Sequence, residues 1–514
     1  MPLVASFIRK VPTASGARAV QIVHKRGRRV VGIEHIGSAH DDAQLAVLME
    51  IARQQLHAGQ EVLDLGADSP AGPAPARAAP VPRVAGARSQ LLWDALAGGY
   101  ARLGLDAVGD EAFKALVLGR VIEPTSKADT LRVLADIGVQ APSLRTVFRS
   151  LVRCLERDYR GALATACLAH SATTPAGRAS LIMYDCTTLY FETENEDDLR
   201  RVGMSKERRV DPQIQVGLLV DAGGFPLEVV CFEGNKAETR TLLPVLRAFQ
   251  DRHGVRDLVV VADAGMLSAA NLLALEEAGF AFVVGSRISK APYDLAAYFA
   301  RHGDYFTDGQ ILESARVMGT GTAARSRRIV YQYSFKRHKR DDKAINAMIE
   351  RAEKVAAGTR PLKKDRFVKL DGATRAVDWA LVERARQLAG LKGYVTNIDP
   401  ATMDGAAVIA AYHDLWQVER SFRMAKTDLR ARPIFHHQRD SIEAHLTIVF
   451  AALAISRHLQ DATAVSIKRL VRTLRLLRTV RIDVAGHAIT AAPAITTEAR
   501  DILDRLPPIN APGH

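Results

Sequence analysis

The chain has 514 residues, 48% of them hydrophobic and 25% charged. This composition excludes a disordered chain, and the length suits roughly two to four domains because single cores rarely exceed about 300 residues. Lys and Arg number 70 against 57 Asp and Glu, which gives a net charge of +13. That excess favours a polyanionic partner, most commonly nucleic acid, with a merely solvated basic surface as the alternative.

Cysteine usage and hydropathy bear on the compartment. The four cysteines form no CxxC pair, which indicates a reducing environment and argues against a cysteine zinc cluster. The first residues lack the long apolar core of a signal peptide. The richest apolar run, Leu446–Ile455, is far short of the roughly 18 residues of a membrane span and suits a buried helix. We therefore expect a cytoplasmic protein with no membrane partner.

The N-terminal segment predicts a small α+β domain. Short β-rich runs between residues 4 and 35 are separated by Gly and Ser turns, and residues 41–56 have helical periodicity. The hairpin would carry a basic cluster of Lys25, Arg26, Arg28 and Arg29. This makes the segment a candidate DNA-binding domain.

An Ala-, Pro- and Gly-rich stretch without apolar periodicity, residues 66–87, predicts a linker. The helical region after it contains two amphipathic segments, Ser126–Gly138 and Ser143–Leu155, each beginning with a Ser that suits an N-cap. One interpretation is a helix-turn-helix DNA reader with Arg145 and Arg149 facing the duplex. An ordinary helical hairpin is favoured over it, because helix pairs are so common.

From about residue 180 the pattern becomes β-rich. Three apolar runs form a predicted meander, and a helix–strand–helix–strand succession follows. This order indicates an α/β fold with a mixed sheet whose later strands are parallel and covered by helices.

Two aspartates end apolar strands of this predicted sheet. Asp185 closes LIMYD and Asp263 closes VVVAD. Neighbouring parallel strands present their C-terminal ends on one sheet edge, and two carboxylates meeting there would repel each other unless a divalent cation bound both. The alternative is that each Asp serves as a turn or helix-cap residue, and both interpretations stay open at this point.

A third acidic residue lies on a predicted helix near residues 406–457. Tyr412, Glu419 and Lys426 are spaced by seven residues, nearly two helical turns, and so share one face. Trp416 and Arg423 lie beside them. Arg423 and Lys426 suit phosphate contacts, and with Tyr412 they are candidate DNA contacts. The competing interpretation is a solvated face with a Glu419–Arg423 ion pair.

With these motifs the sequence resembles bacterial insertion-sequence transposases of the DDE type. It resembles in particular the branch with a Tyr-x2-Arg-x3-Glu-x6-Lys signature, here Tyr412, Glu419 and Lys426. Leu415 occupies the Arg position of that signature, which leaves any role of the Arg to Arg420 or Arg423. The first-Asp strand LIMYDCTTLYFE, the stretch from GMSKERRVDP to FEGNKAET, and VVVADAGMLSAANL also match. The intervals, 78 residues between the aspartates and 156 to Glu419, suit a branch with an insertion between the second Asp and the Glu.

The resemblance implies a ribonuclease-H-like mixed-sheet catalytic core, interrupted by an insertion domain. It implies that Asp185, Asp263 and Glu419 are catalytic and hold two Mg²⁺ ions, for which Mn²⁺ would substitute. Asp185 would bridge the ions, and Asp263 and Glu419 would be terminal ligands. The expected activity is cleavage of the inverted repeats of an insertion sequence and joining of the 3′-OH ends to target DNA. We expect a homodimer on DNA, in the nucleoid-associated fraction of a bacterial cytoplasm.

The predicted organisation combines the patterns and the resemblance. Its parts are a small α+β domain (1–65), a linker (66–87), a helical domain for DNA-end binding or dimerisation (88–175), the first part of the catalytic core (176–286), a basic insertion domain (287–395), the second part of the core with the Glu helix (396–460), and a C-terminal tail region (461–514).

Further basic residues are candidate DNA contacts. Those after the first-Asp strand, which a solvated loop explains equally well, are Lys206, Arg208 and Arg209. The segment Arg325–Lys343 interleaves Tyr331, Tyr333 and Phe335 with bases, as a DNA-tracking surface does, and its DNA contacts would include Lys336, Arg337 and Lys339. An exposed strand edge is the alternative. Mg²⁺ prefers oxygen ligands, so three nearby histidines are interpreted as structural or close to phosphates: His436, His437 and His445.

Three other functions compete with a transposase. The first is a ribonuclease-H-like nuclease that cuts DNA without joining strands. The second is a non-catalytic, domesticated DNA-binding relative, against which the presence of all three acidic residues speaks. A metal-dependent phosphatase acting on small substrates is the least favoured, because the chain is so basic.

Overall fold

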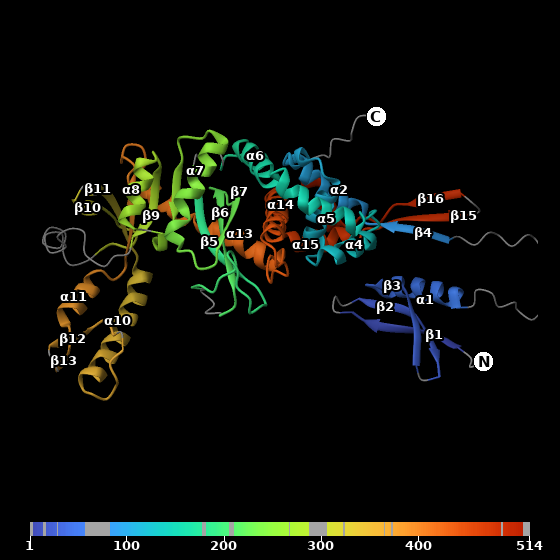
Figure 1. The fold of residues 1–514 in the computed structure, drawn as a ribbon, viewed down its shortest axis with the longest axis horizontal. Helices are drawn as coiled ribbons and strands as arrows, with labels where there is room; N and C mark the ends of the chain where they lie inside the picture. The colour runs from blue at the N-terminus through green and yellow to red at the C-terminus, as the bar shows by residue number, and fades with distance from the viewer. Residues whose placement is uncertain are drawn as a thin grey trace, which may run out of the picture. The chain divides into compact units, whose positions relative to one another are not determined.

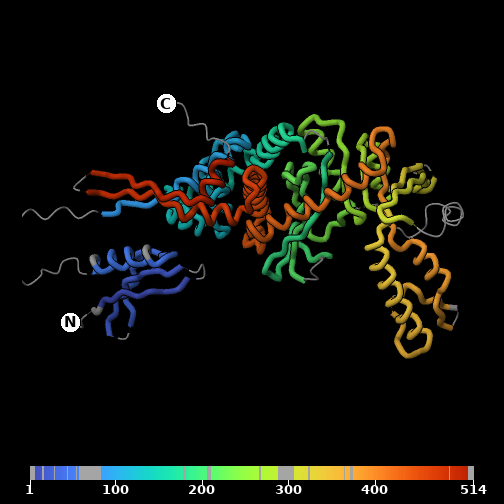
Figure 2. The backbone as a smooth tube through the Cα atoms, turned by 180° about the vertical axis from the view of Figure 1, so that it is seen from behind, coloured from blue at the N-terminus to red at the C-terminus, as the bar shows by residue number. Residues whose placement is uncertain are grey.

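The computed structural model folds into two compact units, Met1–Ala79 and Pro80–His514, which are described separately (Figure 1, Figure 2). The structure describes residues 4–13, 17–27, 29–56, 83–176, 181–204, 210–266, 268–286, 306–321, 324–363, 365–371, 374–484 and 487–506.

The first unit is a three-stranded antiparallel sheet with a helix on one face. Its elements are β1 (Val4–Pro12), β2 (Arg18–Arg26), β3 (Arg29–Ala39) and α1 (Asp42–Leu56). Val20 and Ile22 point from β2 into a small core with Leu45 and Ala52 of α1. Gly37 of β3 permits this packing, because a Cβ there would lie 2.8 Å from Leu48. The strands and helix predicted from the sequence are confirmed.

The second unit begins with a strand where the linker was expected to continue. Residues 83–87 belong to β4 (Arg83–Arg88), which pairs antiparallel with β15 (Thr479–Val484). The rest of the predicted linker lies outside the described residues. The C-terminal region is therefore tied to the start of this unit.

Helices follow β4. They are α2 (Gln90–Arg102), α3 (Glu111–Ile122), α4 (Lys127–Asp136), α5 (Leu144–Glu156) and α6 (Tyr159–Ala172). Ser126 and Ser143 cap α4 and α5 by accepting hydrogen bonds from Asp129 and Thr146, as the sequence predicted. Whether α5 reads DNA through Arg145 and Arg149 stays a prediction.

An eight-stranded mixed sheet forms the centre of the second unit, in the order β10-β11-β14-β9-β8-β5-β6-β7. Its strands are β5 (Leu181–Tyr190), β6 (Gln213–Asp221), β7 (Pro226–Glu233), β8 (Val259–Ala262), β9 (Ala281–Ser286), β10 (Ile311–Met318), β11 (Arg325–Tyr333) and β14 (Leu391–Thr396). β5, β6 and β7 form an antiparallel meander, and β8 and β9 continue the sheet in parallel with β5. The crossover helices are α7 (Leu242–His253) and α8 (Ala269–Glu277). The predicted mixed sheet is confirmed.

The region predicted as an insertion domain, residues 287–395, is divided in the structure. Its strands β10, β11 and β14 extend the central sheet beyond β9. A separate small core, with Ile345, Phe367 and Val382 in it, unites α10 (Phe335–Ala356), β12 (Val368–Asp371), β13 (Thr374–Val377) and α11 (Trp379–Gln387). In Figure 1 these four elements lie together beyond the sheet. The sequence could not reveal this division, because pairing of β11 with β14 joins segments about 60 residues apart.

The long apolar helix α14 (Arg439–Thr463) joins the helices to the sheet. It packs against α3, α5 and β7. Among the described helices it alone is long and apolar enough to cross a membrane, but it is mostly buried inside the protein, as predicted for Leu446–Ile455. The helices before it are α12 (Gly405–His413) and α13 (Trp416–Arg423), and α15 (Ile467–Arg475), β16 (His487–Ala491) and α16 (Thr497–Arg505) follow it.

A buried ion pair holds β11 to α8. The Arg327 side chain is fully buried, and its Nε and Nη2 atoms donate hydrogen bonds of 2.7 and 2.8 Å to the carboxylate of Glu276. The same strand buries Tyr331 and Tyr333, which are 2% and 7% exposed. The predicted DNA-tracking role of these two tyrosines is therefore wrong, because β11 lies between β10 and β14 and places them in the core.

Replacing Glu276 with Gln should destabilise the protein by about 3 kcal/mol, because it leaves the buried Arg327 charge without its counter-ion. The matched control is Asp342→Asn, which breaks the half-exposed Arg386–Asp342 pair and should cost less than about 1 kcal/mol. Urea unfolding of both variants is the measurement. Equal midpoints for the two variants would contradict this role of the buried pair in the sheet.

Candidate active site

The two aspartates lie side by side on neighbouring strands. The parallel pairing of β5 with β8 ends with Tyr184 opposite Ala262, so the next residues, Asp185 and Asp263, are adjacent. Asp263 directly follows β8, as predicted, whereas β5 continues to Tyr190 by pairing with β6. Asp185 thus lies within its strand, at the point where the neighbouring strand stops. Asp185 is partly exposed and Asp263 exposed, so ligands can reach this edge.

Local hydrogen bonds orient both carboxylates. Oδ1 of Asp185 accepts from the Cys186 amide at 2.8 Å, and Oδ1 of Asp263 accepts from the Ala264 amide at 2.7 Å. The hydroxyl of Tyr412 donates a second hydrogen bond to Oδ1 of Asp263, also at 2.7 Å. The phenol therefore fixes the second aspartate together with the Ala264 amide.

The Tyr412 ring rests on the sheet. A Cβ at Gly285 of β9 would lie 2.6 Å from the Tyr412 hydroxyl, so only glycine leaves room for the phenol there. Burial and the neighbouring Asp263 carboxylate raise the pKa of Tyr412 well above its usual value, which keeps the phenol a hydrogen-bond donor. The ring also lies 4.8 Å from that of Tyr394 of β14.

A lysine that sequence analysis missed, Lys392, lies next to Tyr412. Nζ of Lys392, on β14, lies 5.1 Å from the centre of the Tyr412 ring, in a cation–π arrangement. Burial, and then Arg337, lower the pKa of Lys392, while Asp263 opposes that shift. The available signal was a single charged residue within the apolar strand LKGYVT. It is a weak signal, since only the fold shows which strand β14 joins.

Glu419 lies on α13, which packs against β5 and β6. The predicted single helix face is wrong, because α12 ends at His413 and α13 starts at Trp416. A π-helical turn, Met424–Asp428, then carries Lys426. Tyr412 and Lys426 nevertheless contact the two aspartate-bearing segments. Tyr412 donates a hydrogen bond to Asp263 after β8, and the Lys426 ammonium donates to the Thr187 hydroxyl of β5.

The donor set suits a hard divalent cation, because carboxylate oxygens are the ligands that Mg²⁺ prefers. The paired aspartates supply such oxygens at one strand edge. Within the described residues, however, no three His, Cys, Asp or Glu side chains are grouped closely enough to hold an ion. The structure thus brings Asp185 and Asp263 together and places the helix of Glu419 beside them, while the role of Glu419 as third ligand stays a prediction.

The other predicted DNA contacts have different fates. Lys206, Arg208 and Arg209 lie outside the described residues. Arg423 is exposed on α13. At the start of α10, Lys336 and Lys339 are exposed and Arg337 is half-buried. Lys339 lies 4.7 Å from the ring centre of the exposed Phe335. These contacts stay predictions.

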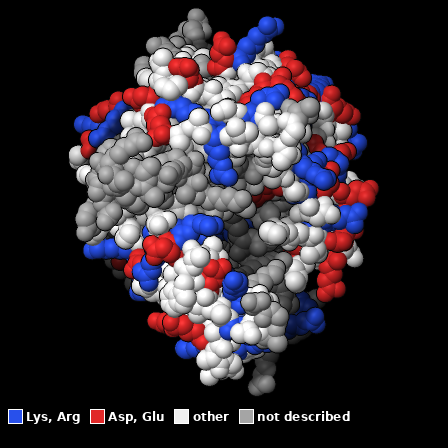
Figure 3. Space-filling model, turned by 90° about the vertical axis from the view of Figure 1, so that its left-hand side faces the viewer, with Lys and Arg blue, Asp and Glu red and all other residues white. Residues whose placement is uncertain are grey.

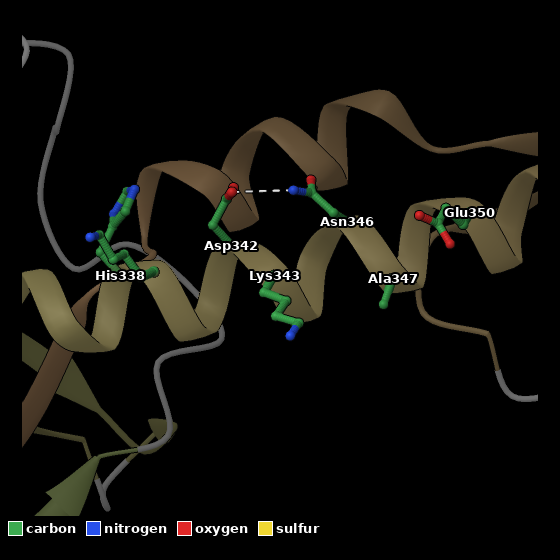
Figure 4. A pocket seen from close by; sticks show the side chains of 7 residues that line it. His338, Asp342, Lys343, Asn346, Ala347 and Glu350 are labelled. Carbon is green, nitrogen blue, oxygen red and sulfur yellow. Dashed lines mark hydrogen bonds between the residues drawn. The ribbon is translucent and has the colours of Figure 1, made fainter.

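On the face that Figure 3 displays, the basic and acidic side chains of the described residues are intermixed. A hollow of about 410 Å³ runs along α10 itself (Figure 4). Its lining comes entirely from that helix and includes Lys339, Asp342 and Glu350. None of the three candidate catalytic carboxylates lines this hollow, so it is separate from the aspartate pair.

A buried cluster of Arg120, Lys127 and His445 contacts the segment near Ala431, which follows the helix of Glu419. His445 of α14 donates from Nε2 to the Ala431 carbonyl at 3.1 Å, and its Nδ1 lies 3.4 Å from Nζ of Lys127 and 3.5 Å from Nη2 of Arg120. The Lys127 ammonium also contacts Nε2 of His436. Burial, and then the charge of Arg120, lower the pKa of Lys127 to about 7. The structural interpretation of His436 and His445 thus matches their contacts.

The fold and the paired aspartates define an α/β protein with a carboxylate-based site. The family model described as "Transposase DDE domain" matches residues 177–455, more than half of the chain. The chain therefore belongs to the transposase DDE domain family. No curated protein matches the chain.

Among solved structures, a cryo-EM structure of the piggyBac transposase synaptic complex with hairpin DNA is similar to this chain. The match covers 82% of this chain and 84% of that one, with 12% identity and a TM-score of 0.37.

Replacing Lys127 with Met should change how stability depends on pH. Between pH 7 and 9 the unfolded lysine stays protonated while the folded one loses its proton, so the wild type gains stability as pH rises. The gain is up to about 1.4 kcal/mol per pH unit, and the variant should lack it.

The measurement is urea unfolding of both proteins at pH 7, 8 and 9. Burial and nearby cations lower the pKa of His436 to about 4 and that of His445 below its usual value, so neither histidine titrates in this window. Parallel stability profiles for wild type and variant would show that Lys127 keeps an ordinary pKa.

Proposed function

We propose that this chain is a DNA transposase that binds the inverted repeats of an insertion sequence, cleaves the element ends and joins the 3′-OH ends to target DNA. The observation that carries the proposal is the register of β5 and β8, which sets Asp185 beside Asp263 within the part of the chain that the family model covers.

The strand order supports a ribonuclease-H-like core. The first five strands of the sheet lie in the order β7-β6-β5-β8-β9, with β5, β6 and β7 antiparallel and β8 and β9 parallel to β5. This is the order 3-2-1-4-5, in which the first strand is central and carries the first aspartate. The family match supports assigning that role to Asp185.

Members of this family use divalent metal ions, and the oxygen donors of this site fit Mg²⁺ or Mn²⁺. Asp185, Asp263 and Glu419 would hold these ions through their carboxylate oxygens. Bound ions would supply charge neutralisation for an in-line displacement at phosphorus.

The chain's own residues position the reaction. Tyr412 holds Asp263 by its hydrogen bond, which lowers the freedom of that carboxylate before any ligand binds. Lys392 lies over the ring of Tyr412, and Lys426 bonds Thr187 of β5, so both would supply positive charge for a DNA phosphate at this site. Water and a 3′-hydroxyl attack phosphorus in the same geometry, so one site can serve cleavage and joining. No covalent protein–DNA intermediate is needed.

Several finer features belong to the same proposal. The insertion-sequence origin in a bacterial cytoplasm rests on the signature residues Tyr412, Glu419 and Lys426. A homodimer on DNA follows from the need to cut two element ends together.

Asp185→Asn, Asp263→Asn and Glu419→Gln should each lower strand cleavage by about a thousandfold or more, equivalent to roughly 4 kcal/mol of lost transition-state stabilisation. The measurement is nicking of a plasmid that carries the DNA flanking the gene, in Mg²⁺ and in Mn²⁺. DNA affinity should change little, because no cation is removed.

The matched control is Asp257→Asn, an exposed carboxylate in the loop before β8, which should cleave like the wild type. Full cleavage by an Asp185 or Asp263 variant would refute the site. Full cleavage by the Glu419 variant alone would remove that residue from it.

Charge reversal of the exposed Lys336 and Lys339 should reduce the slope of log Kd against log salt by about 2, because each lost phosphate contact removes roughly 0.9. The control reverses Arg351 and Lys354, two exposed cations farther along the same helix, with the same change in net charge. Equal slopes for both double variants would show that the start of α10 does not contact DNA.

A further inference from the structure

The sheet of the first unit has two unlike faces. One packs against α1 through Ile8, Val20 and Ile22. The other carries the alternate residues of the same strands, because successive side chains of a strand point to opposite faces. No described helix of this unit covers that second face, which we call the open face.

Two cross-strand rows define the open face. The strand register sets Arg9, Gln21 and His35 opposite one another, and likewise Phe7, Val23 and Ile33. Nη2 of Arg9 donates to Oε1 of Gln21 at 2.8 Å, so the first row is already ordered. His35 is exposed at the end of that row.

The second row is apolar, and its two outer side chains are exposed to solvent. Val23 is buried in the centre, whereas Phe7 and Ile33 on either side are 39% and 53% exposed. Nζ of Lys25 lies 5.2 Å from the centre of the Phe7 ring. The open face thus combines bases, an amide, an imidazole and two exposed apolar side chains.

The described acidic side chains are confined to one side of this unit, whereas cations occur on both. The acidic residues among the described part of this unit all lie on the α1 side or at its start: Glu34, Asp41, Asp42 and Glu50. Glu34 accepts a hydrogen bond from Gln55 of α1, Asp42 pairs with Arg18, and Glu50 pairs with Arg53. The described open face therefore has cations with no carboxylate among them, while Arg26 and Arg29 add exposed positive charge at the β2–β3 hairpin.

The side chains of the open face suit the base edges of the major groove of duplex DNA. That groove is about 12 Å wide and admits β-strands, and the axes of the three strands span roughly 10 Å. Arg and Gln are the side chains that pair with guanine and adenine edges, and apolar side chains contact thymine methyl groups. A lipid surface would require more apolar area, and an acidic protein would not require an ordered Arg–Gln pair.

We propose that the open face of β1, β2 and β3 binds the major groove of double-stranded DNA, with Arg9, Gln21 and His35 toward base edges and Lys25 toward the phosphate backbone. The inference rests on the proposed function, to which it adds the surface that recognises the DNA. It does not depend on the catalytic carboxylates, because binding precedes cleavage.

The test uses the full-length chain in EDTA, so that no cleavage occurs. Two duplexes are compared by fluorescence anisotropy, one with the sequence flanking the gene and one with the same bases shuffled. Arg9→Ala and Lys25→Ala should each weaken binding to the flanking duplex about tenfold. Gln21→Ala should lower the preference for the flanking over the shuffled duplex about fivefold or more.

Arg53→Ala is the matched control, since it removes one exposed arginine from the α1 side and should change affinity less than twofold. Wild-type affinity in both the Arg9 and Lys25 variants, or no binding by the wild type, overturns the inference. An unchanged preference in the Gln21 variant overturns the base-edge contact. Wild-type cleavage by Asp185→Asn would refute the catalytic proposal and leave these binding results standing.

Discussion

The candidate site depends on the parallel pairing of β5 with β8. That pairing stops after Tyr184 and Ala262, and β8 ends there while β5 continues along β6. Asp185 and Asp263 consequently meet where β8 ends beside the continuing strand β5. Two carboxylates side by side repel each other in the absence of a cation. A bound metal ion would relieve this repulsion. The family match to residues 177–455 agrees with such a site.

The rest of the second unit supports this edge. The Tyr412 side chain packs against β14 and β9, and the lack of a side chain at Gly285 leaves room for its hydroxyl. The break between α12 and α13 lets Tyr412 reach β8 while Lys426, one π-helical turn beyond α13, reaches β5. α14 and the Lys127–His445 cluster then fix the segment after α13 to the helices that precede the sheet. The first unit has its own core and its own candidate DNA surface.

Local sequence signals predicted much of this arrangement. Apolar alternation located the strands of both units, the Ser caps located α4 and α5, and the run of β-rich and helical segments predicted parallel strands beside the first aspartate. Three features could not be predicted from local sequence, because they depend on contacts between residues distant in the chain. Tyr331 and Tyr333 resemble surface aromatics among bases until β11 pairs with β14, which buries them. The seven-residue spacing suggested one helix, but a turn after His413 separates Tyr412 from Glu419. The position of Lys392 near Tyr412 follows only from the pairing of β14 with β9.

The central claim is that Asp185, Asp263 and Glu419 together hold divalent ions. Cleavage of the polypeptide by hydroxyl radicals from bound Fe²⁺ tests it most directly, because the radicals cut the backbone close to the ion. Mapping the fragments of the full-length chain should give cuts near residues 185, 263 and 419, suppressed by excess Mg²⁺ and absent from Asp185→Asn. Cuts clustered elsewhere, or the same cuts in the Asp185 variant, would contradict the claim.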